Sequence, residues 1–509
     1  MSTRVRIDVD GRSIEVDADA SLAAALITAN VATTRTSVRG EPRGPLCGMG
    51  VCFECRATVD DFPHVRTCMT RVRAGMRVRT GAPAAAPLTA AAPPLARLDA
   101  DVVVVGAGPA GLAAACAAAQ GGKRVLILDD NDGTGGQIWR RDAATPAATW
   151  RARAQRLGVL VESSTRVVGV HDERSLLAVR GDAARVVGYG ALVLATGSTE
   201  RFVTFPGWTL PRVFGAGGAH ALLKSGLRVD GSRVVVAGSG PLLLAVAATW
   251  ARHGARVVAL VEQAPAARVR AFARGLWARP AKLAQAAWLR ARLLGVPFRM
   301  GWWPQRIDSA ADALRVTITD GRRVAALATD YVACGFGLVP DVRLAAVLGC
   351  AIERGAVVVD DEQRTSVPHV FCAGETTGIG GVDKALLEGE RAGSAAAGVR
   401  STTSRAMLAR ERRFAAALET TFALRDELRA LTAPDTIVCR CEDVLRSDVD
   451  ACASWRDAKL QTRIGMGPCQ GRVCGSGVAF THGFAVADAR PPVFNVPLST
   501  LCGGPDSGA

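Results

Sequence analysis

The chain has 509 residues, 49% of them hydrophobic, and a formal net charge of +15. These values exclude global disorder and allow several domains. The positive charge is spread along the chain as arginines, without a basic tail or a nucleic-acid motif, so we expect no nucleic-acid partner and allow for an acidic protein. The first residues contain no apolar signal segment, so we expect a cytoplasmic protein with reduced cysteines.

The first 80 residues predict a small domain with a metal centre. Residues 3–16 alternate apolar and polar around Asp10-Gly11, which is typical of a β-hairpin, and residues 21–29 predict a helix. Four cysteines follow in C-x4-C-x2-C spacing with the last after a longer gap: Cys47, Cys52, Cys55 and Cys68. This spacing favours a [2Fe–2S] cluster over structural zinc, which usually uses two two-cysteine knuckles.

The stretch that begins the next domain predicts a dinucleotide site. An alanine- and proline-rich linker at 81–97 precedes it. Val102, Val103, Val104 and Val105 form a strand of the kind buried in parallel sheets, and a helix-forming segment follows. Three glycines in G-x-G-x-x-G spacing (Gly106, Gly108, Gly111) lie between them. Asp129 ends the next strand, where a carboxylate meets a ribose. The same residues rule out a membrane span at 102–120, despite its apolar length.

A second, incomplete fingerprint follows. Gly238 and Gly240 lie after a strand and Glu262 ends the next one, but Leu243 takes the place of the third glycine. The fold inference stands, whereas the ligand is either NAD, which Glu262 would favour over NADP, or none in a repurposed pocket. Residues 264–306 predict arginine-rich helices, either a solvated face or a docking surface for an acidic partner or nucleotide.

The C-terminal part predicts a second metal centre. We expect residues 400–432 to be helical and charged, and the last residues, TLCGGPDSG and Ala509, to be a flexible tail. Two cysteine pairs between them suit a closed four-thiolate site: Cys439 with Cys441, and Cys469 with Cys474. We expect a [2Fe–2S] cluster here, with zinc or mononuclear iron as alternatives.

Several motifs resemble known families. Residues 3–80 resemble a plant-type β-grasp ferredoxin domain, and the C-terminal cysteine pattern with GMGPCQGRVC resembles the bacterioferritin-associated ferredoxin-like (BFD-like) domain. The segments 206–208 and 215–218 resemble the opine oxidase, hydrogen cyanide synthase, D-hydroxyproline dehydrogenase and sarcosine oxidase α-chain family. In flavoproteins with two dinucleotide-binding domains, similar motifs surround FAD. The resemblance therefore implies FAD contacts at Gly106, Gly108, Pro109, Ala110, Gly111, Asp129, Gly135, Gly136, Gln137, Ala195, Thr196, Gly197, Gly374 and Glu375.

The resemblance implies an α/β fold of the disulfide-reductase-like type, with two Rossmann domains between two iron–sulfur modules. Glu375 stands where the superfamily usually has aspartate. The expected parts are a β-grasp domain at 1–80, the linker at 81–97, the first FAD half at 98–210, a degenerate nicotinamide-type domain at 211–335, the second FAD half at 336–398, and a helical linker with the BFD-like domain at 399–500.

The family resemblance implies the electron-transfer α subunit of an amine or imino-acid dehydrogenase. A β subunit with its own FAD would oxidise the C–N bond, and this chain would pass electrons to a quinone or another carrier, with at most peripheral membrane association. No catalytic acid–base group is predicted, because the six histidines form no triad. No C-x2-C or C-x4-C pair lies between 106 and 393, so we expect no thiol–disulfide chemistry on the flavin. Two alternatives are a self-contained NADH-dependent reductase and a non-enzymatic iron or redox carrier.

Overall fold

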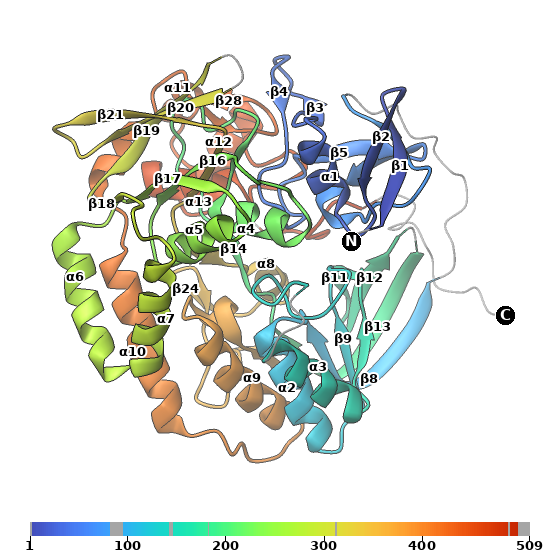
Figure 1. Cartoon of the computed structure of the whole chain (residues 1–509). Coiled ribbons are helices and arrows are strands. Elements are labelled where there is room, and N and C mark those ends of the chain that lie inside the picture. Colours follow the sequence, from blue (N-terminus) through green and yellow to red (C-terminus); the bar gives the residue numbers. More distant parts are fainter. Residues whose placement is uncertain are drawn as a thin grey trace. The chain divides into compact units, whose positions relative to one another are not determined.

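The computed structural model describes residues 3–81, 95–141, 146–181, 183–310, 313–486 and 489–496 (Figure 1). Most of the predicted linker and the whole predicted tail lie outside these residues. The chain forms two compact units: unit 1 comprises 1–86, 200–337 and 418–486, and unit 2 comprises 87–199, 338–417 and 487–509. The finer domain boundaries predicted from the sequence stay predictions.

The N-terminal part of unit 1 is a five-stranded sheet covered by a helix. The predicted hairpin is confirmed, because β1 pairs antiparallel with β2 across Asp10-Gly11. Helix α1 (Leu22–Thr28) is capped by Ser21, whose side chain accepts from the backbone N–H of Ala24. The sheet order is β2-β1-β7-β5-β6. Its strands are β1 (Arg4–Val9), β2 (Arg12–Asp17), β5 (Arg56–Val59), β6 (Phe62–Arg66) and β7 (Arg77–Arg79), with η1 (Thr67–Met69) after β6. Strands β3 (Arg35–Thr36) and β4 (Pro42–Arg43) pair with each other in a separate sheet.

Unit 2 contains a seven-stranded sheet that combines distant segments. The four predicted valines end β8 (Ala96–Val105), which lies between β9 (Val125–Leu128) and β13 (Ala183–Leu194), parallel to both. Strand β26 (Val370–Cys372) pairs parallel with the last three residues of β13, 192–194. The remaining elements are α3 (Ala147–Arg156), β10 (Leu160–Glu162), β11 (Arg166–Asp172), β12 (Ser175–Arg180), β23 (Leu338–Pro340), α8 (Arg343–Val347), β24 (Ile352–Glu353), β25 (Ala356–Val357) and η3 (Gly374–Thr377).

Two helices of unit 2, α2 (Pro109–Gln120) and α9 (Val382–Ala396), lie side by side and pack against one face of this sheet (Figure 1). Small residues allow the contact: a Cβ on Gly389 would lie 2.2 Å from the carbonyl oxygen of Ala110, and one on Gly393 would lie 2.0 Å from that of Ala114. The packing brings the segment after β26 to the first glycine turn. It therefore assembles one site from residues far apart in sequence.

The central part of unit 1 is a parallel sheet with the order β15-β22-β16-β17-β18 and an antiparallel three-stranded sheet. Its elements are β15 (Val213–Phe214), α4 (Ala216–Lys224), β16 (Arg233–Gly238), α5 (Leu242–Arg252), β17 (Arg256–Glu262), α6 (Ala266–Gly275), η2 (Leu276–Ala278), α7 (Pro280–Ala291), β18 (Phe298–Met300), β19 (Trp303–Ala310), β20 (Ala313–Thr319), β21 (Val324–Thr329) and β22 (Tyr331–Gly335).

The C-terminal part of unit 1 is small and mostly helical. Its elements are η4 (Asp426–Leu431), β27 (Ile437–Cys439), β28 (Val444–Leu445), α11 (Arg446–Asp450), α12 (Trp455–Thr462) and α13 (Cys474–His482). Along the chain, β14 (Ser198–Glu200) and α10 (Arg405–Thr421) each run across a boundary between the units. Within the described ranges, no helix has both the length and the apolar character needed to cross a bilayer.

Candidate redox site

The first glycine turn has the geometry of a dinucleotide cradle. Gly106 has a φ of +107°, and a Cβ there would lie 2.3 Å from the carbonyl oxygen of Ala195. A Cβ on Gly111 would lie 1.8 Å from the carbonyl oxygen of Gly106, so helix and turn touch through backbone. Gly108, in contrast, leaves space, because its Cβ would meet only the Cα of Gly136 at 3.9 Å. The free space therefore lies where a pyrophosphate approaches the α2 N-terminus.

The predicted ribose carboxylate lies beside this turn. Asp129 is 6% exposed, and its carboxylate accepts hydrogen bonds from the backbone N–H of Ala107 at 2.5 Å and of Asn131 at 2.7 Å. Burial raises the pKa of Asp129, although these hydrogen bonds oppose the shift. The Asp129 carboxylate thus connects the end of β9 to the glycine turn through hydrogen bonds within the protein.

The Gly-Gly-Gln loop crosses the cradle. The backbone N–H of Gly135 donates to the carbonyl oxygen of Ala107 at 2.8 Å, and a Cβ on Gly136 would lie 2.9 Å from the Cα of Gly108. The side-chain oxygen of Gln137 is buried and has no hydrogen-bond partner among the described residues. An unsatisfied buried polar atom beside a dinucleotide turn fits a site that a bound ligand completes.

The predicted Ala-Thr-Gly segment follows β13 and contacts the second half of unit 2. The hydroxyl of Thr196 donates to the carbonyl oxygen of Asp341 at 2.7 Å, and the backbone N–H of Gly197 donates to Thr376 Oγ1 at 3.0 Å. Gly374 lies against α2, since a Cβ there would lie 2.7 Å from the Cβ of Ala110. The structure therefore brings together the predicted residues of the FAD site.

Glu375 contacts the loop that precedes α9. Its carboxylate accepts hydrogen bonds from the backbone N–H groups of Gly381 at 2.7 Å and Gly380 at 3.2 Å. Burial raises the pKa of Glu375, and these donors act against that shift. In this structure the longer side chain shapes the loop before α9, and its contact with FAD stays a prediction.

Sequence reasoning missed a buried ion pair next to Gly374. Lys384 Nζ lies 2.8 Å from Glu388 Oε2 and donates to the carbonyl oxygen of Gly374 at 2.9 Å, while Glu388 accepts from the backbone N–H of Gly374 at 3.1 Å. Both side chains are at most 5% exposed. An i,i+4 Lys–Glu pair is usually solvated, so its spacing gave no sign of this role.

The four N-terminal cysteines are all buried and lie on one loop and a short turn. The thiols of Cys47 and Cys52 interact directly, as do those of Cys55 and Cys68. Burial raises the pKa of Cys47, but hydrogen bonds from Cys52 and backbone N–H groups, including that of Met49, lower it to about 6. These donors stabilise the thiolate, which is the form that binds iron.

A helix supports this loop from below. A Cβ on Gly218 in α4 would lie 2.2 Å from the carbonyl oxygen of Leu46, so the helix contacts the loop through backbone. Glu200, which the sequence did not single out, is buried there and accepts from the backbone N–H of Gly217 at 2.8 Å. Burial raises the pKa of Glu200 to about 7. Residues 215–218 therefore pack against the loop that carries the N-terminal cysteines.

The four C-terminal thiols form a closed ring of contacts. Cys439 interacts with Cys441 and Cys474, and Cys469 interacts with the same two. Hydrogen bonds from Cys441 and Cys474 hold the pKa of Cys439 well below its usual value. Among the described residues, no three His, Cys, Asp or Glu side chains converge as the ligands of a single ion. A closed set of four thiols suits a [2Fe–2S] cluster, in which each iron takes two protein ligands, and it also suits the alternatives, zinc and mononuclear iron.

The second glycine turn is tight at its first glycine and open at its second, where a Cβ on Gly240 would meet nothing within 4 Å. Gly238 has a φ of +133°, and a Cβ there would lie 1.8 Å from the carbonyl oxygen of Gly335. The Glu262 carboxylate accepts from the backbone N–H groups of Gly240 and Ala264, both at 2.8 Å. Leu243, at the position of the third glycine, is 2% exposed and packs in the core.

A segment of the chain itself lies at the carboxyl ends of these strands. Ser239 Oγ donates to the carbonyl oxygen of Phe422 at 2.9 Å. The side chain of Gln263 donates to the carbonyl oxygen of Ala423 at 3.2 Å and accepts from the backbone N–H of Arg425 at 3.2 Å. Dinucleotides bind outside the carboxyl ends of parallel strands, so residues 422–425 lie where one would pass.

Two protein-family models match parts of this chain. The description "Pyridine nucleotide-disulphide oxidoreductase" matches residues 100–395. The chain belongs to this family. Residues 2–83 match the description "2Fe-2S iron-sulfur cluster binding domain". The predicted flavoprotein fold with an N-terminal iron–sulfur domain is therefore confirmed, and the matches support FAD and at least one [2Fe–2S] cluster.

Two curated proteins are similar to this chain over most of its length. An opine oxidase subunit of Rhizobium meliloti (strain 1021) is 32% identical over 455 residues, which cover 79% of this chain and 98% of that protein. Hydrogen cyanide synthase subunit HcnB of Pseudomonas protegens is 31% identical over 422 residues, covering 73% and 89%. The predicted membership of the opine oxidase and hydrogen cyanide synthase group is confirmed. L-proline dehydrogenase from P. horikoshii superposes with a TM-score of 0.71 over 98% of each chain and, at 20% identity, shares the fold.

Proposed function

We propose that this chain is the electron-transfer subunit of a multi-subunit dehydrogenase that oxidises a C–N bond of an amino acid, imino acid or opine. The observation that carries the proposal is the ring of four C-terminal thiols, which adds a second redox site to a flavoprotein with an N-terminal iron–sulfur domain. The relatives are named as subunits of an opine oxidase and a hydrogen cyanide synthase.

FAD would bind in unit 2. Gly106, Gly108 and Gly111 would leave room for the pyrophosphate, Asp129 would meet the ribose, and the free oxygen of Gln137 would gain a partner. A bound flavin accepts two electrons and releases them singly, whereas an iron–sulfur cluster carries one. The protein residues would position these groups and exclude water.

Clusters would bind at the two cysteine groups of unit 1. Cys47, Cys52, Cys55 and Cys68 would hold the first, and Cys439, Cys441, Cys469 and Cys474 the second. The backbone N–H of Met49 donates to the sulfur of Cys47 at 3.3 Å, and that of Glu54 to the sulfur of Cys52 at 3.4 Å. Hydrogen bonds of this kind raise the reduction potential of a cluster by stabilising its more negative reduced form.

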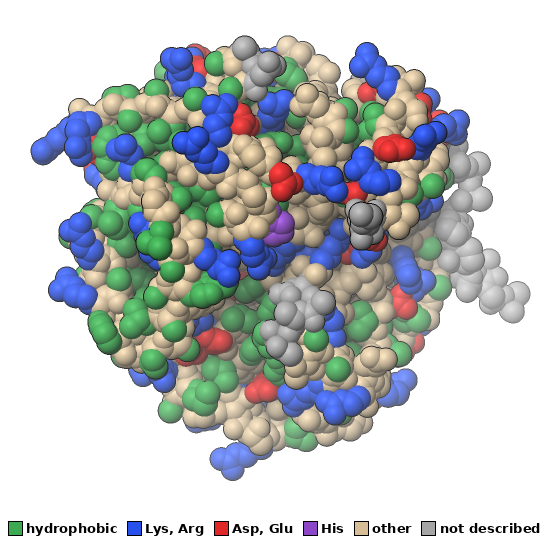
Figure 2. Space-filling model, in the orientation of Figure 1, with side chains coloured by type: hydrophobic (Ala, Val, Ile, Leu, Met, Phe, Trp, Pro, Cys, Tyr) green, Lys and Arg blue, Asp and Glu red, His purple; other side chains and the backbone are tan. Residues whose placement is uncertain are grey.

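The partner would be an FAD-containing subunit with an acidic docking face. No acidic residue occurs between Glu262 and Asp308, while α6 and α7 bury none of their residues. Trp277 and Trp288 are exposed on this segment, and basic and hydrophobic side chains gather over it (Figure 2). Arginine beside exposed tryptophan is typical of protein interfaces.

Direct NADH oxidation is the weaker candidate. Leu243 replaces the third glycine, and residues 422–425 hold the polar side chains of Ser239 and Gln263. We therefore propose that the second Rossmann domain serves as a structural support for the C-terminal part rather than as a coenzyme site.

Co-purification tests the proposal. The chain would be expressed together with its genomic neighbours, and a tightly bound flavoprotein subunit should co-elute and reduce this chain's flavin when an amine substrate is added. A triple variant, Arg268→Glu, Arg270→Glu and Arg274→Glu, should lose that partner, whereas the exposed controls Arg12→Glu and Arg322→Glu should keep it. Oxidation of an amine by the chain alone would contradict the proposal.

A further inference from the structure

A buried ion pair connects the two cysteine groups. Glu54 stands in sequence between Cys52 and Cys55, and Arg440 stands between Cys439 and Cys441. Arg440 Nε lies 2.8 Å from Glu54 Oε2, and each side chain is 1% exposed. A residue flanked by cysteines of one group therefore bonds directly to a residue flanked by cysteines of the other.

A second arginine completes the joint. Arg35 Nη2 donates to Glu54 Oε1 at 2.7 Å and to the backbone carbonyl oxygen of Arg440 at 2.9 Å. Both carboxylate oxygens of Glu54 thus pair with guanidinium groups, one on each side. Two guanidinium groups share this one carboxylate away from water, and Asp443 and a Cys441 thiolate add negative charge near Arg35.

The residues around the Glu54–Arg440 pair are buried. Arg43 and Asp443 join the same two segments at 2.9 Å, with both side chains at most 1% exposed. Trp208 packs against Arg440, 5.4 Å from ring centroid to guanidinium, and its Nε1 donates to the carbonyl oxygen of Ile437 at 2.7 Å.

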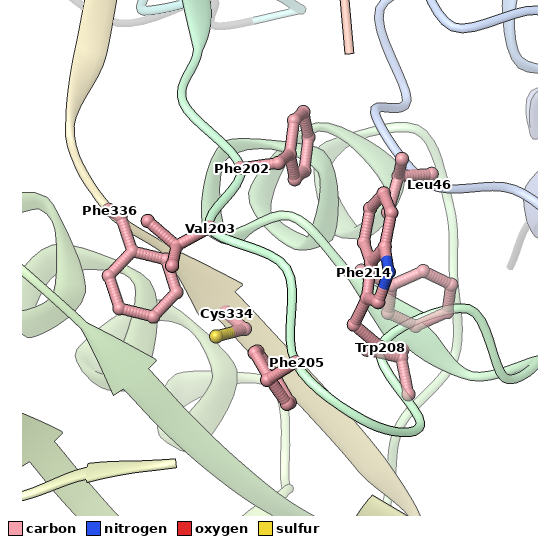
Figure 3. Close-up of a pocket in the computed structure, with 9 residues that line it drawn as sticks. Leu46, Phe202, Val203, Phe205, Trp208, Phe214, Cys334 and Phe336 are labelled. Atoms are coloured by element: carbon pink, nitrogen blue, oxygen red, sulfur yellow. The ribbon is translucent and has the colours of Figure 1, made fainter. Parts of the chain in front are cut away.

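The packing continues beneath the cysteines. Cys47 and Cys52 of the first group and Cys441 and Cys469 of the second belong to one apolar cluster. Figure 3 shows aromatic rings, among them Trp208 and Phe205, around a cavity of only about 10 Å³, which is at the lower limit for one water molecule. The region next to the two groups is therefore closely packed.

We propose that Glu54, with Arg35 and Arg440, makes the two cysteine groups one redox unit in which an electron passes directly from cluster to cluster. This inference rests on the proposed function, because it requires a cluster at each group. When both cysteine groups hold clusters, one cluster would give up one electron and the other would accept it, and Glu54, Arg35 and Arg440 would hold the two groups at a fixed separation. Glu54 acts as a positioning residue, since its negative charge opposes reduction of both clusters while its bonds fix their separation.

Electron paramagnetic resonance of the anaerobically reduced holoprotein tests the coupling. Two reduced [2Fe–2S] clusters held close together should split or broaden each other's signals when both are reduced, and the splitting should be absent when only one is reduced. Two independent, unbroadened signals at full reduction would overturn the inference. A single cluster signal would refute the proposed function instead, so the two failures are distinguishable.

Redox titration of variants tests the role of Glu54. Glu54→Gln should shift both midpoint potentials upward, with the ratio of reduced to oxidised cluster rising about tenfold at fixed potential, which corresponds to about 59 mV. Glu442→Gln is the matched control. Glu442 stands next to a cysteine in sequence, Cys441, but it pairs with the exposed Arg463. The Glu442→Gln variant should therefore shift the potential of one cluster only. If Glu54→Gln does not fold, Arg440→Lys serves as the second variant. It retains the positive charge and should keep the magnetic coupling. A Glu54→Gln shift in one potential alone, or loss of coupling in a folded Arg440→Lys protein with both clusters, would contradict a shared role.

Discussion

Two glycines of the first turn should respond differently to the same substitution. In Gly111→Ala the new Cβ would lie 1.8 Å from the carbonyl oxygen of Gly106 and 3.3 Å from Val104 Cγ1, so turn and helix must separate. Overpacking of this kind costs about 1–3 kcal/mol. For a domain of about 150–250 residues, each kcal/mol lowers the melting temperature by roughly 2–4 °C. Gly111→Ala should therefore destabilise the protein even without FAD.

Gly108→Ala is the matched variant. Its Cβ would meet only the Cα of Gly136 at 3.9 Å, an ordinary contact, and Gly108 has a φ of −71° that alanine adopts readily. The protein without FAD should keep its melting temperature, while the methyl group displaces the phosphates. Loss of one charge-assisted hydrogen bond, about 1.5–3 kcal/mol, weakens FAD binding roughly tenfold to a hundredfold.

Thermal melting of the FAD-free protein and calorimetric titration with FAD separate the two effects. The reasoning would be refuted if Gly108→Ala lowered the melting temperature as much as Gly111→Ala, because the turn would then have no free space for a ligand. It would be refuted equally if Gly108→Ala bound FAD as tightly as the original chain.

Three further predictions concern unit 1. NADH should not bleach the flavin of the isolated chain within seconds, and stopped-flow absorbance checks this; rapid bleaching would mean that residues 422–425 leave the second turn open. The pKa of Glu200 is about 7 in the folded protein and 4.5 in the unfolded chain, so between these pH values the unfolded chain loses this proton first. The free energy of unfolding should therefore fall by up to about 3 kcal/mol as the pH rises over that range. Glu200→Gln should flatten this fall in denaturant titrations, and an unchanged slope would assign it to other groups. Replacing Cys469 and Cys474 by alanine should remove one cluster signal while FAD and the other signal remain; loss of both signals with FAD retained would show that the sites assemble together.

Local sequence patterns predicted the parts of the fold that depend on short-range chemistry. The hairpin at Asp10-Gly11 and the turn at Gly106 follow from residues adjacent in sequence, and both are confirmed. The full length of β8 was not expected, because its first half alternates charged residues such as Arg97 and Asp99 that pair at the surface. Pattern alone could not distinguish that exposed extension from the charged end of a linker.

Buried charges were the main omission. Glu54, Arg440, Lys384 and Glu388 resemble ordinary surface residues in sequence, and only long-range packing takes them out of water. Glu54 and Arg440 lie in segments that meet through tertiary structure, so no spacing rule connects them. The G-x-x-x-G pattern of Gly389 and Gly393 was the one available sign of the close contact between α9 and α2.

The most direct test of the account is to purify the intact chain anaerobically, quantify its FAD, iron and acid-labile sulfide, and record electron paramagnetic resonance spectra during stepwise reduction. The account predicts bound FAD together with two distinguishable [2Fe–2S] signals that interact at full reduction. A chain with one such signal and zinc at the C-terminal cysteines would contradict the central claim that this subunit carries electrons through two clusters.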